Sequence, residues 1–278
     1  MVGTVLTLEQ IERFVELGYC EVPGAFTTRQ AAAACRCVWR RMEQKAGIRE
    51  FDPQTWPSDY DIEEHLSDPE ICACYTDRLA AAVEQLLGPG RWRGNRTWGL
   101  WPVNFSLGQG VPYEIPTWGW HIDGNWFLHQ LGSPHQGLLV IGLFTDIEPR
   151  WGGTILALGS HKRTAGVLAA HPDGMTHLEL FDAVLSDPLG NFHEVTGAAG
   201  DVVIAHPFLF HTRGMKHFGP PRIISNTEAG LLEPMNLARS DPSQYSILEH
   251  SICKALAEDP IPPRDARKCQ FQLQRAYQ

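Results

Sequence analysis

The first residues of the chain place apolar and polar side chains with a helical period. Thr7 and Gln10 have the spacing of a capping box, in which two side chains bond each other's backbone amides at a helix start. Apolar side chains then recur three and four residues apart from Ile11 to Val15, and Gly18 follows as a helix-ending residue. This pattern predicts a short helix at the beginning of the chain.

A second helix is predicted after a short strand. The segment GYCEVPGAF is strand-like and is interrupted by Pro23 and Gly24. An alanine-rich stretch follows from about Thr28 to Lys45, and alanine has the highest intrinsic helix propensity. The N-terminal part of the chain, about residues 1–90, is therefore expected to be mainly helical.

The pattern changes at Arg91, after which short apolar runs are separated by glycine, proline and Asp/Asn turns. The runs include GLLVIGLF, GTILAL, GDVVIAH and RIISNTEAGLL. Many strands after N-terminal helices favour a mainly β, α+β fold: a double-stranded β-helix (jelly roll, cupin-like) with the helices packed on one sheet. We expect this jelly-roll core over about 91–235 and a polar C-terminal tail over about 236–278.

Composition narrows the class of protein. The 278 residues, 43% of them hydrophobic, suffice for one substantial core, and no repeat or linker divides the chain, so one domain over 1–278 is expected. A formal net charge of −9 without a long basic run argues against a nucleic-acid partner. No apolar run reaches the about eighteen residues of a membrane helix, and no signal-peptide pattern opens the chain. We therefore expect a cytoplasmic protein with no membrane partner.

The seven cysteines are odd in number and do not indicate a disulfide framework. Four of them form the pairs Cys35/Cys37 and Cys72/Cys74, whereas structural zinc sites usually have two residues between paired cysteines. Residues two apart on a helix point to different faces. Reduced thiols are therefore expected instead of a zinc site.

The segment WGWHIDG carries candidate metal chemistry. His121 and Asp123 are two residues apart, which on an extended chain puts an imidazole and a carboxylate on the same face. Such a pair can hold one metal ion. A 2-His-1-carboxylate triad needs one more imidazole and leaves the other coordination positions open for co-substrate and oxygen.

The segment GDVVIAHPFLFHTRGMKHFGPPRII offers His206, His211 and His217 as the third ligand. Eleven positions after His211 stands Arg222, whose guanidinium could bind the far carboxylate of a dicarboxylate that chelates the metal. The same offset from the other two histidines reaches His217 and Glu228, which could not serve. The spacing selects His211, and His206 is expected to be a core histidine.

A second His-x-Asp match, His171 and Asp173, lies in a loop that contains proline and glycine. The interval from Asp123 to His211 fits the several strands predicted between the ligands, whereas the interval from Asp173 is too short for them. We therefore expect no metal at His171.

Longer stretches of the chain resemble the phytanoyl-CoA dioxygenase family of iron and 2-oxoglutarate oxygenases. They are the opening LTLEQIERFVELGY with its PGAF, the WHID motif, EPRWGGTILALGSHK, and GDVVIAHPFLFH with the arginine that follows. The resemblance extends over nearly the whole chain. It implies that His121, Asp123 and His211 bind Fe(II), and that Arg222 anchors 2-oxoglutarate with support from Thr154.

Two residues depart from the family pattern. Trp151 stands where the family commonly has asparagine, and Arg213 follows the distal histidine where a small residue is frequent. The surroundings of the co-substrate are therefore expected to differ from those of the family, and Arg213 is an alternative anchor.

The reaction implied by the resemblance consumes 2-oxoglutarate and O2 and oxidises a C–H bond, with release of succinate and CO2. Hydroxylation is the default outcome, while desaturation, ring closure or epoxidation can follow from the same chemistry. Halogenation is disfavoured because Asp123 occupies the position that such enzymes leave to chloride.

The substrate is expected to be a small, largely apolar metabolite. Trp126 and Phe127 follow the metal motif and are candidate substrate contacts, although aromatic residues at such positions also serve as core. The acidic chain lacks the basic entrance that an acyl-CoA would need. Two alternatives are a cupin-like metal enzyme independent of 2-oxoglutarate, which would not need Arg222, and a non-catalytic small-molecule binding protein on the same fold.

Overall fold

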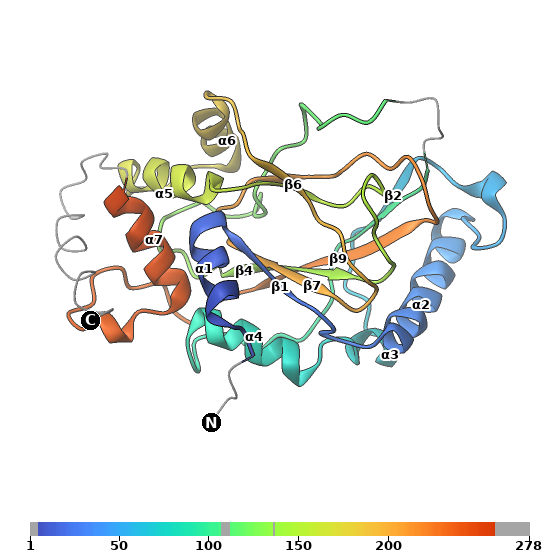
Figure 1. Ribbon diagram of the computed structural model, residues 1–278, viewed down its shortest axis with the longest axis horizontal. Helices are drawn as coiled ribbons and strands as arrows, with labels where there is room; N and C mark the ends of the chain where they lie inside the picture. The colour runs from blue at the N-terminus through green and yellow to red at the C-terminus, as the bar shows by residue number, and fades with distance from the viewer. Residues whose placement is uncertain (1–4, 107–111, 136, 259–278) are drawn as a thin grey trace.

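A computed structural model describes residues 5–106, 112–135 and 137–258 of the chain. The helices are α1 (Leu8–Leu17), α2 (Thr28–Ala46), α3 (Pro69–Cys72), α4 (Asp77–Leu87), α5 (Ser160–Ala170), α6 (His177–Leu185) and α7 (Ile247–Glu258), with the 3-10 helices η1 (Pro53–Thr55) and η2 (Pro242–Gln244). The strands are β1 (Tyr19–Val22), β2 (Asp59–Ile62), β3 (Trp101–Asn104), β4 (Leu138–Leu143), β5 (Ile155–Ala157), β6 (Phe192–Glu194), β7 (Val202–Ala205), β8 (His211–Thr212) and β9 (Arg222–Ala229). Figure 1 shows the strands in the middle of the molecule and the helices around them. None of the described helices combines the length and apolar character that a membrane crossing requires.

Capping boxes start the first two helices. The Thr7 side chain accepts a hydrogen bond from the Gln10 amide, and the Gln10 side chain accepts one from the Thr7 amide at 2.7 Å. Thr27 and Gln30 repeat the arrangement at α2. Gly18 ends α1 in the left-handed region with φ 89°, where glycine meets no steric penalty. Both predicted helices are thus confirmed.

The strands form two antiparallel sheets. The larger sheet has six strands in the order β1-β7-β4-β9-β3-β2, and the smaller has three in the order β6-β5-β8. In the larger sheet β4 lies between β7 and β9, and Val140 is opposite Ile204 on one side and Thr227 on the other. All six residues of β4 are buried, which explains why its sequence is a continuous apolar run and does not alternate.

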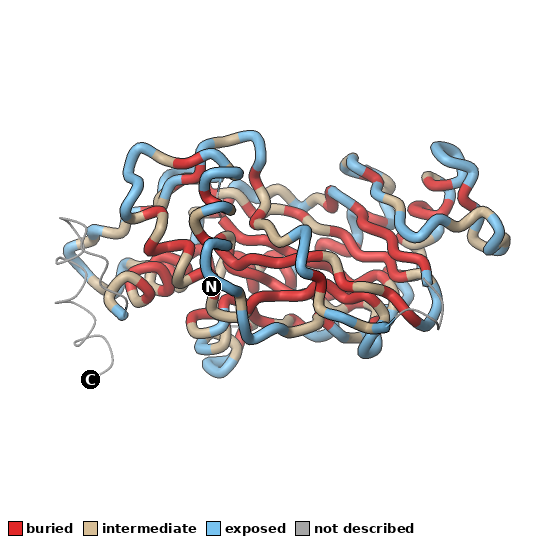
Figure 2. Tube along the Cα trace, turned by 90° about the horizontal axis from the view of Figure 1, so that it is seen from above, coloured by how far each residue is buried: buried red, intermediate tan, exposed pale blue. Residues whose placement is uncertain are grey.

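Alternate residues of β4 contribute to two different apolar cores. Leu139 and Ile141 pack in a core that also contains Leu156 of the smaller sheet. Leu138 and Val140 belong to a larger core with residues of α1, α2 and α4. One face of the larger sheet therefore meets the smaller sheet, and the helices cover the other face; the buried chain runs through the middle of the molecule in Figure 2. The expected jelly roll with helices packed on one sheet is confirmed.

Some elements lie where the sequence pattern did not place them. Helices α5 and α6 are inserted between β5 and β6, inside the region expected to be strands. Strand β2 lies in the expected helical part and joins the larger sheet, as does β1, which the strand-like segment GYCEVPGAF predicted. The expected polar tail contains α7, which buries Leu248 and Ile252 and contacts α1, α4 and α5. Residues 259–278 of that tail lie outside the described residues.

Candidate functional site

Two of the predicted ligands are joined through their backbones. His211 begins β8, and His121 lies in the segment that follows β3. The His121 amide donates to the His211 carbonyl at 3.0 Å, and the His211 amide donates to the His121 carbonyl at 2.9 Å. This reciprocal pair puts the two imidazoles side by side, with their ring centroids 4.4 Å apart.

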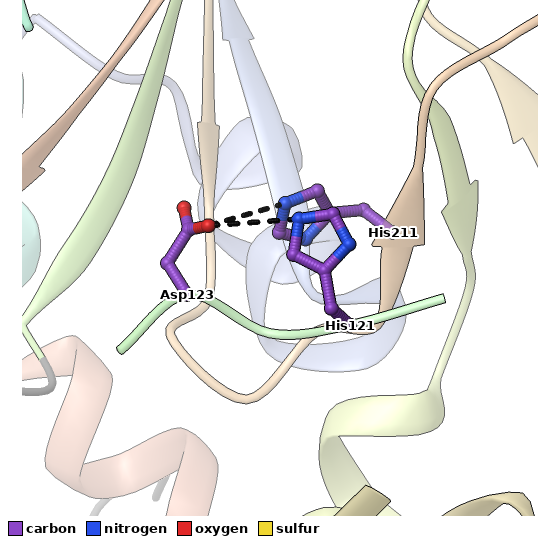
Figure 3. A group of neighbouring side chains, drawn as sticks. All are labelled: His121, Asp123 and His211. Atoms are coloured by element: carbon purple, nitrogen blue, oxygen red, sulfur yellow. Dashed lines mark ion pairs between the residues drawn. The ribbon is translucent and has the colours of Figure 1, made fainter. Parts of the chain in front are cut away.

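The third predicted ligand points at both imidazoles. Figure 3 shows the Asp123 carboxylate directed toward the two rings, with Oδ1 3.6 Å from His121 Nε2 and 3.9 Å from His211 Nε2. One ligand atom from each of the three residues lies within 4.8 Å of the others. Ligand atoms about 2 Å from one ion lie roughly 3 Å from each other, so small side-chain adjustments would close this group around a single metal.

The two imidazole rings form hydrogen bonds through Nδ1, so that each Nε2 stays free to bind a metal. His121 Nδ1 lies 2.7 Å from the Gly119 carbonyl, and His211 Nδ1 lies 3.1 Å from the Leu209 carbonyl. A carbonyl only accepts, so each Nδ1 carries the proton and each Nε2 presents a lone pair. His211 Nε2 is buried and has no hydrogen-bond partner among the described residues. A buried nitrogen with an unused lone pair is the donor that a metal ion would satisfy.

Burial keeps His211 in the form that binds metals. Desolvation holds the pKa of His211 below its usual range because it penalises the charged imidazolium, and the neighbouring His121 acts in the same direction. Asp123 opposes this shift in the pKa. A neutral imidazole is the species that ligates a metal.

A cavity of about 190 Å³ extends from the two histidines to Arg222, and Thr154 lines it as well. Arg222 is 1% exposed, and its Nε and Nη2 have no hydrogen-bond partner among the described residues. Burial, followed by the charge of Arg213, lowers the pKa of Arg222 to about 9. A buried cation without a partner is costly, and an anionic group placed in this cavity would remove that cost.

Arg213 already has acidic partners. Its guanidinium forms ion pairs with Asp59, at 3.3 Å, and with Asp61, both on β2. Trp151, the other departure from the family pattern, lies against Lys216, whose Nζ is 5.3 Å from the indole ring centre. Arg213 borders the same cavity as Arg222, but both of its terminal nitrogens are in these ion pairs.

A second, larger cavity of about 680 Å³ adjoins the candidate metal group on the other side of Asp123. Trp126 lines this cavity and is 65% exposed. Phe127 does not line it; its ring stacks on His135 at 4.9 Å and borders a narrow cavity of about 20 Å³. The two aromatic rings pack edge to face with centroids 5.6 Å apart, but they border different cavities.

The other histidines that the sequence offered as ligands, His206, His217 and His171, are not members of the candidate metal group. His206 Nδ1 accepts a hydrogen bond from a backbone amide at 3.1 Å, and its ring packs on His161. His217 is buried against Tyr113. His171 Nδ1 lies 2.8 Å from a carbonyl of α5.

A second group of three possible metal ligands consists of Cys37, Asp68 and Glu70. There Arg40 pairs with Asp68 at 2.6 Å and balances its charge.

Sequence reasoning missed Glu228, which lines both the narrow and the large cavity beside Asp123. The signal was present, because Arg222, Asn226 and Glu228 alternate along β9 and residues two apart on a strand share a face. Arg222 had already been assigned to the site, so this alternation could have identified Glu228. The segment 63–65, which also borders the large cavity, carries no comparable pattern.

No protein-family model matches the chain, and no curated protein matches it either. Solved structures do match its fold, and three of them either depend on 2-oxoglutarate or were solved with it bound. The carbocyclase SnoK from nogalamycin biosynthesis aligns over 80% of this chain and 82% of its own, with 18% identity and a TM-score of 0.53. HygX from Streptomyces hygroscopicus, with nickel and 2-oxoglutarate bound, aligns over 80% and 86% with 18% identity and a TM-score of 0.51. EctD from S. alaskensis, with 2-oxoglutarate and 5-hydroxyectoine, aligns over 80% and 75% with 18% identity and a TM-score of 0.51. At this level of identity the comparisons show the fold, and membership of the phytanoyl-CoA dioxygenase family stays a prediction.

Proposed function

We propose that the protein is an Fe(II)- and 2-oxoglutarate-dependent dioxygenase. One observation carries the proposal: a single cavity has two imidazoles of the candidate metal group at one end and the unpartnered guanidinium of Arg222 at the other. A ligand that chelates a metal and ends in a second carboxylate fits both ends. 2-Oxoglutarate is such a ligand.

Each residue has a defined part in this proposal. His121, Asp123 and His211 would hold Fe(II) and leave positions open for the co-substrate and oxygen. Arg222 would bind the far carboxylate with its two unpartnered nitrogens, and Thr154 would border the same carboxylate. The bound iron would supply the oxygen chemistry, in which one oxygen atom enters succinate and the other enters the oxidised C–H bond while CO2 is released.

The large cavity beside Asp123 is the candidate substrate site. Its lining combines apolar surface from Leu100, Leu139 and Trp126 with the polar groups of Asn125, Asn226 and Glu228. The lining therefore fits a small molecule that has both apolar and polar groups. Hydroxylation remains the default outcome in the proposal.

An anaerobic titration tests the proposal directly. Adding Fe(II) and then 2-oxoglutarate to the apoprotein should produce a weak visible charge-transfer band that requires both components. Asp123→Ala should lose this band because one of three ligands is gone, and it should also lose succinate formation. His171→Ala is the matched control, since it alters the second His-x-Asp sequence and should behave as the unaltered protein does.

Three outcomes would contradict the proposal. Iron binding without any response to 2-oxoglutarate would instead favour a cupin-like metal enzyme that does not use it. A protein that binds neither component would favour a non-catalytic binding role. Loss of the band in His171→Ala together with its retention in Asp123→Ala would place the metal elsewhere.

A further inference from the structure

The charges that border the large cavity are unevenly compensated. Glu64 forms an ion pair with Arg41, so its charge is balanced. Asp123 points toward the two imidazoles of the candidate metal group. Glu228 has neither a hydrogen bond nor an ion pair from its side chain to any of the described residues. It is thus a carboxylate without a partner, next to the place where the substrate would react.

The fold fixes the position of Glu228. It lies on the central strand β9, opposite Leu139 of β4, and alternation along the strand puts it on the same face as Arg222. Arg222 borders the smaller cavity, whereas Glu228 borders the larger one. A single strand face therefore presents a buried cation on the co-substrate side and an anion on the substrate side.

Arg93 borders the same cavity and its charge opposes the rise that burial causes in the pKa of Glu228, but the two side chains form no ion pair. Arg93 is exposed, and its Nε donates to the Leu231 carbonyl at 2.7 Å. His135 borders the same cavity, and its ring stacks on Phe127. A partly buried carboxylate without a partner is destabilising, and a cation placed beside it would favour its charged form.

We propose that Glu228 binds a cationic nitrogen of the substrate, and that the substrate is a small polar molecule carrying a protonated amine. This inference rests on the proposed function. The amine would pair with the carboxylate through a charge-assisted hydrogen bond, which fixes both position and orientation. The rest of the molecule would occupy the cavity between Asn226 and Trp126, with a C–H bond directed at the metal.

The test uses simple probes in place of the unidentified substrate. The full-length protein is loaded with Co(II) and 2-oxoglutarate, and the paramagnetic broadening of proton signals is compared for n-butylammonium and n-butanol. The measurement is made at pH 8, where an alkylammonium keeps its proton and a carboxyl group is normally ionised. We expect the ammonium to bind roughly ten- to a hundredfold more tightly than the alcohol.

Variants assign the preference to Glu228. Glu228→Gln keeps the size of the side chain and should abolish the preference for the ammonium, while Glu228→Asp should keep part of it. Glu63→Gln removes an exposed acidic group of the same cavity lining and should retain the preference. Affinity for 2-oxoglutarate should stay the same in all three variants, because the co-substrate would bind at Arg222.

The outcomes separate the two proposals. Equal broadening by both probes, or a preference that survives Glu228→Gln, would overturn the role of Glu228 and leave the proposed function standing. Failure of the unaltered protein to bind Co(II) or 2-oxoglutarate would overturn the proposed function and this inference with it.

Discussion

At the residue scale, the site depends on charges that are buried without partners in the protein itself. Arg222 is almost completely buried and leaves two nitrogens unpaired among the described residues. Replacing a buried, poorly compensated charge with an apolar side chain of similar volume is often neutral or stabilising. Removing the charge of Arg222 should therefore favour folding and weaken the proposed binding of 2-oxoglutarate.

Arg222→Met is expected to move the two properties in opposite directions. Removing one partner of a buried ion pair costs about 3–5 kcal/mol, which corresponds to a loss of roughly two to three and a half powers of ten in 2-oxoglutarate affinity. The free energy of unfolding of the ligand-free protein should stay the same or rise, because the uncompensated charge is gone. Calorimetric titration of the metal-loaded protein measures the first effect, and chemical denaturation measures the second.

Arg213→Ala is the matched control for Arg222→Met. Arg213 is paired with Asp59 and Asp61, so its removal should leave 2-oxoglutarate affinity nearly unchanged. Arg222→Lys should restore only part of the affinity, because an ammonium keeps the charge and lacks the planar fork. If Arg213→Ala lost the co-substrate while Arg222→Met kept it, the anchor would be Arg213.

The sequence indicated the candidate metal group because its chemistry follows local spacing. The two-residue interval from His121 to Asp123 and the offset from His211 to Arg222 both correspond to positions that the structure brings to one place. The cavity walls were not predictable in this way. Glu63 and Asn226 border the large cavity only because segments that are distant in the sequence fold together there. No short sequence motif indicates such a contact.

At the element scale, the sequence predicted the two N-terminal helices and the apolar strand runs, and it missed the two helices between β5 and β6. The helices with a capping box at Thr7 or Thr27 were predicted. Helix α5 begins after Gly159, which offers no side-chain hydrogen bond, whereas α6 was missed although Thr176 and Glu179 form a capping box at its start. Strand β5 was predicted within the run GTILAL, whereas β6 and β8 contain only three and two residues, too few to establish a period, and tertiary pairing defines them.

Thr27→Ala is expected to destabilise the protein by about 1 kcal/mol, because the side-chain acceptor for the Gln30 amide is lost at the start of α2. Thr28→Ala is the control: Thr28 is equally exposed and lies one position inside the helix, where alanine is favoured. Urea denaturation of both variants gives the comparison. Equal destabilisation by the two substitutions would show that the cap contributes little.

At the scale of the whole molecule, a buried histidine makes stability depend on pH. His161 of α5 lies beneath α1, and its Nε2 donates to the Val15 carbonyl at 3.1 Å. Burial lowers the pKa of His161 to about 4 from its ordinary value of 6.5. Between these two values the unfolded chain binds a proton that the folded protein does not, so this contribution to stability is lost as the pH falls from 6.5 toward 4.

His161→Gln should reduce that dependence. The difference in unfolding free energy between pH 7 and pH 5 should shrink by about 2 kcal/mol in the variant, because glutamine takes up no proton over this range. Urea denaturation at the two pH values, with the unaltered protein alongside, measures the change. An undiminished difference would assign the acid sensitivity to other groups.

The general architecture was predictable because it depends on the distribution of apolar residues. The run LLVIGL could be read as a strand buried on both faces, and the structure uses its alternate residues for two cores. The position of α7 against α1 and α5 was not predictable, since residues after 236 are polar enough to suggest a tail. The apolar face of α7 can be recognised in the sequence only if a helix is assumed over these residues.

Under the proposed function, the reciprocal backbone hydrogen bonds between His121 and His211 determine how the protein responds to a shortage of iron. In a zinc finger the metal organises the chain, so protein made without metal stays unfolded and is exposed to proteolysis. Here the main chain already aligns two of the three candidate ligands, and the two apolar cores do not involve the ion. Chains synthesised while iron is scarce should therefore fold, escape degradation and accumulate as an inactive reserve. When iron returns, activity should recover at the rate of metal uptake, without new protein synthesis.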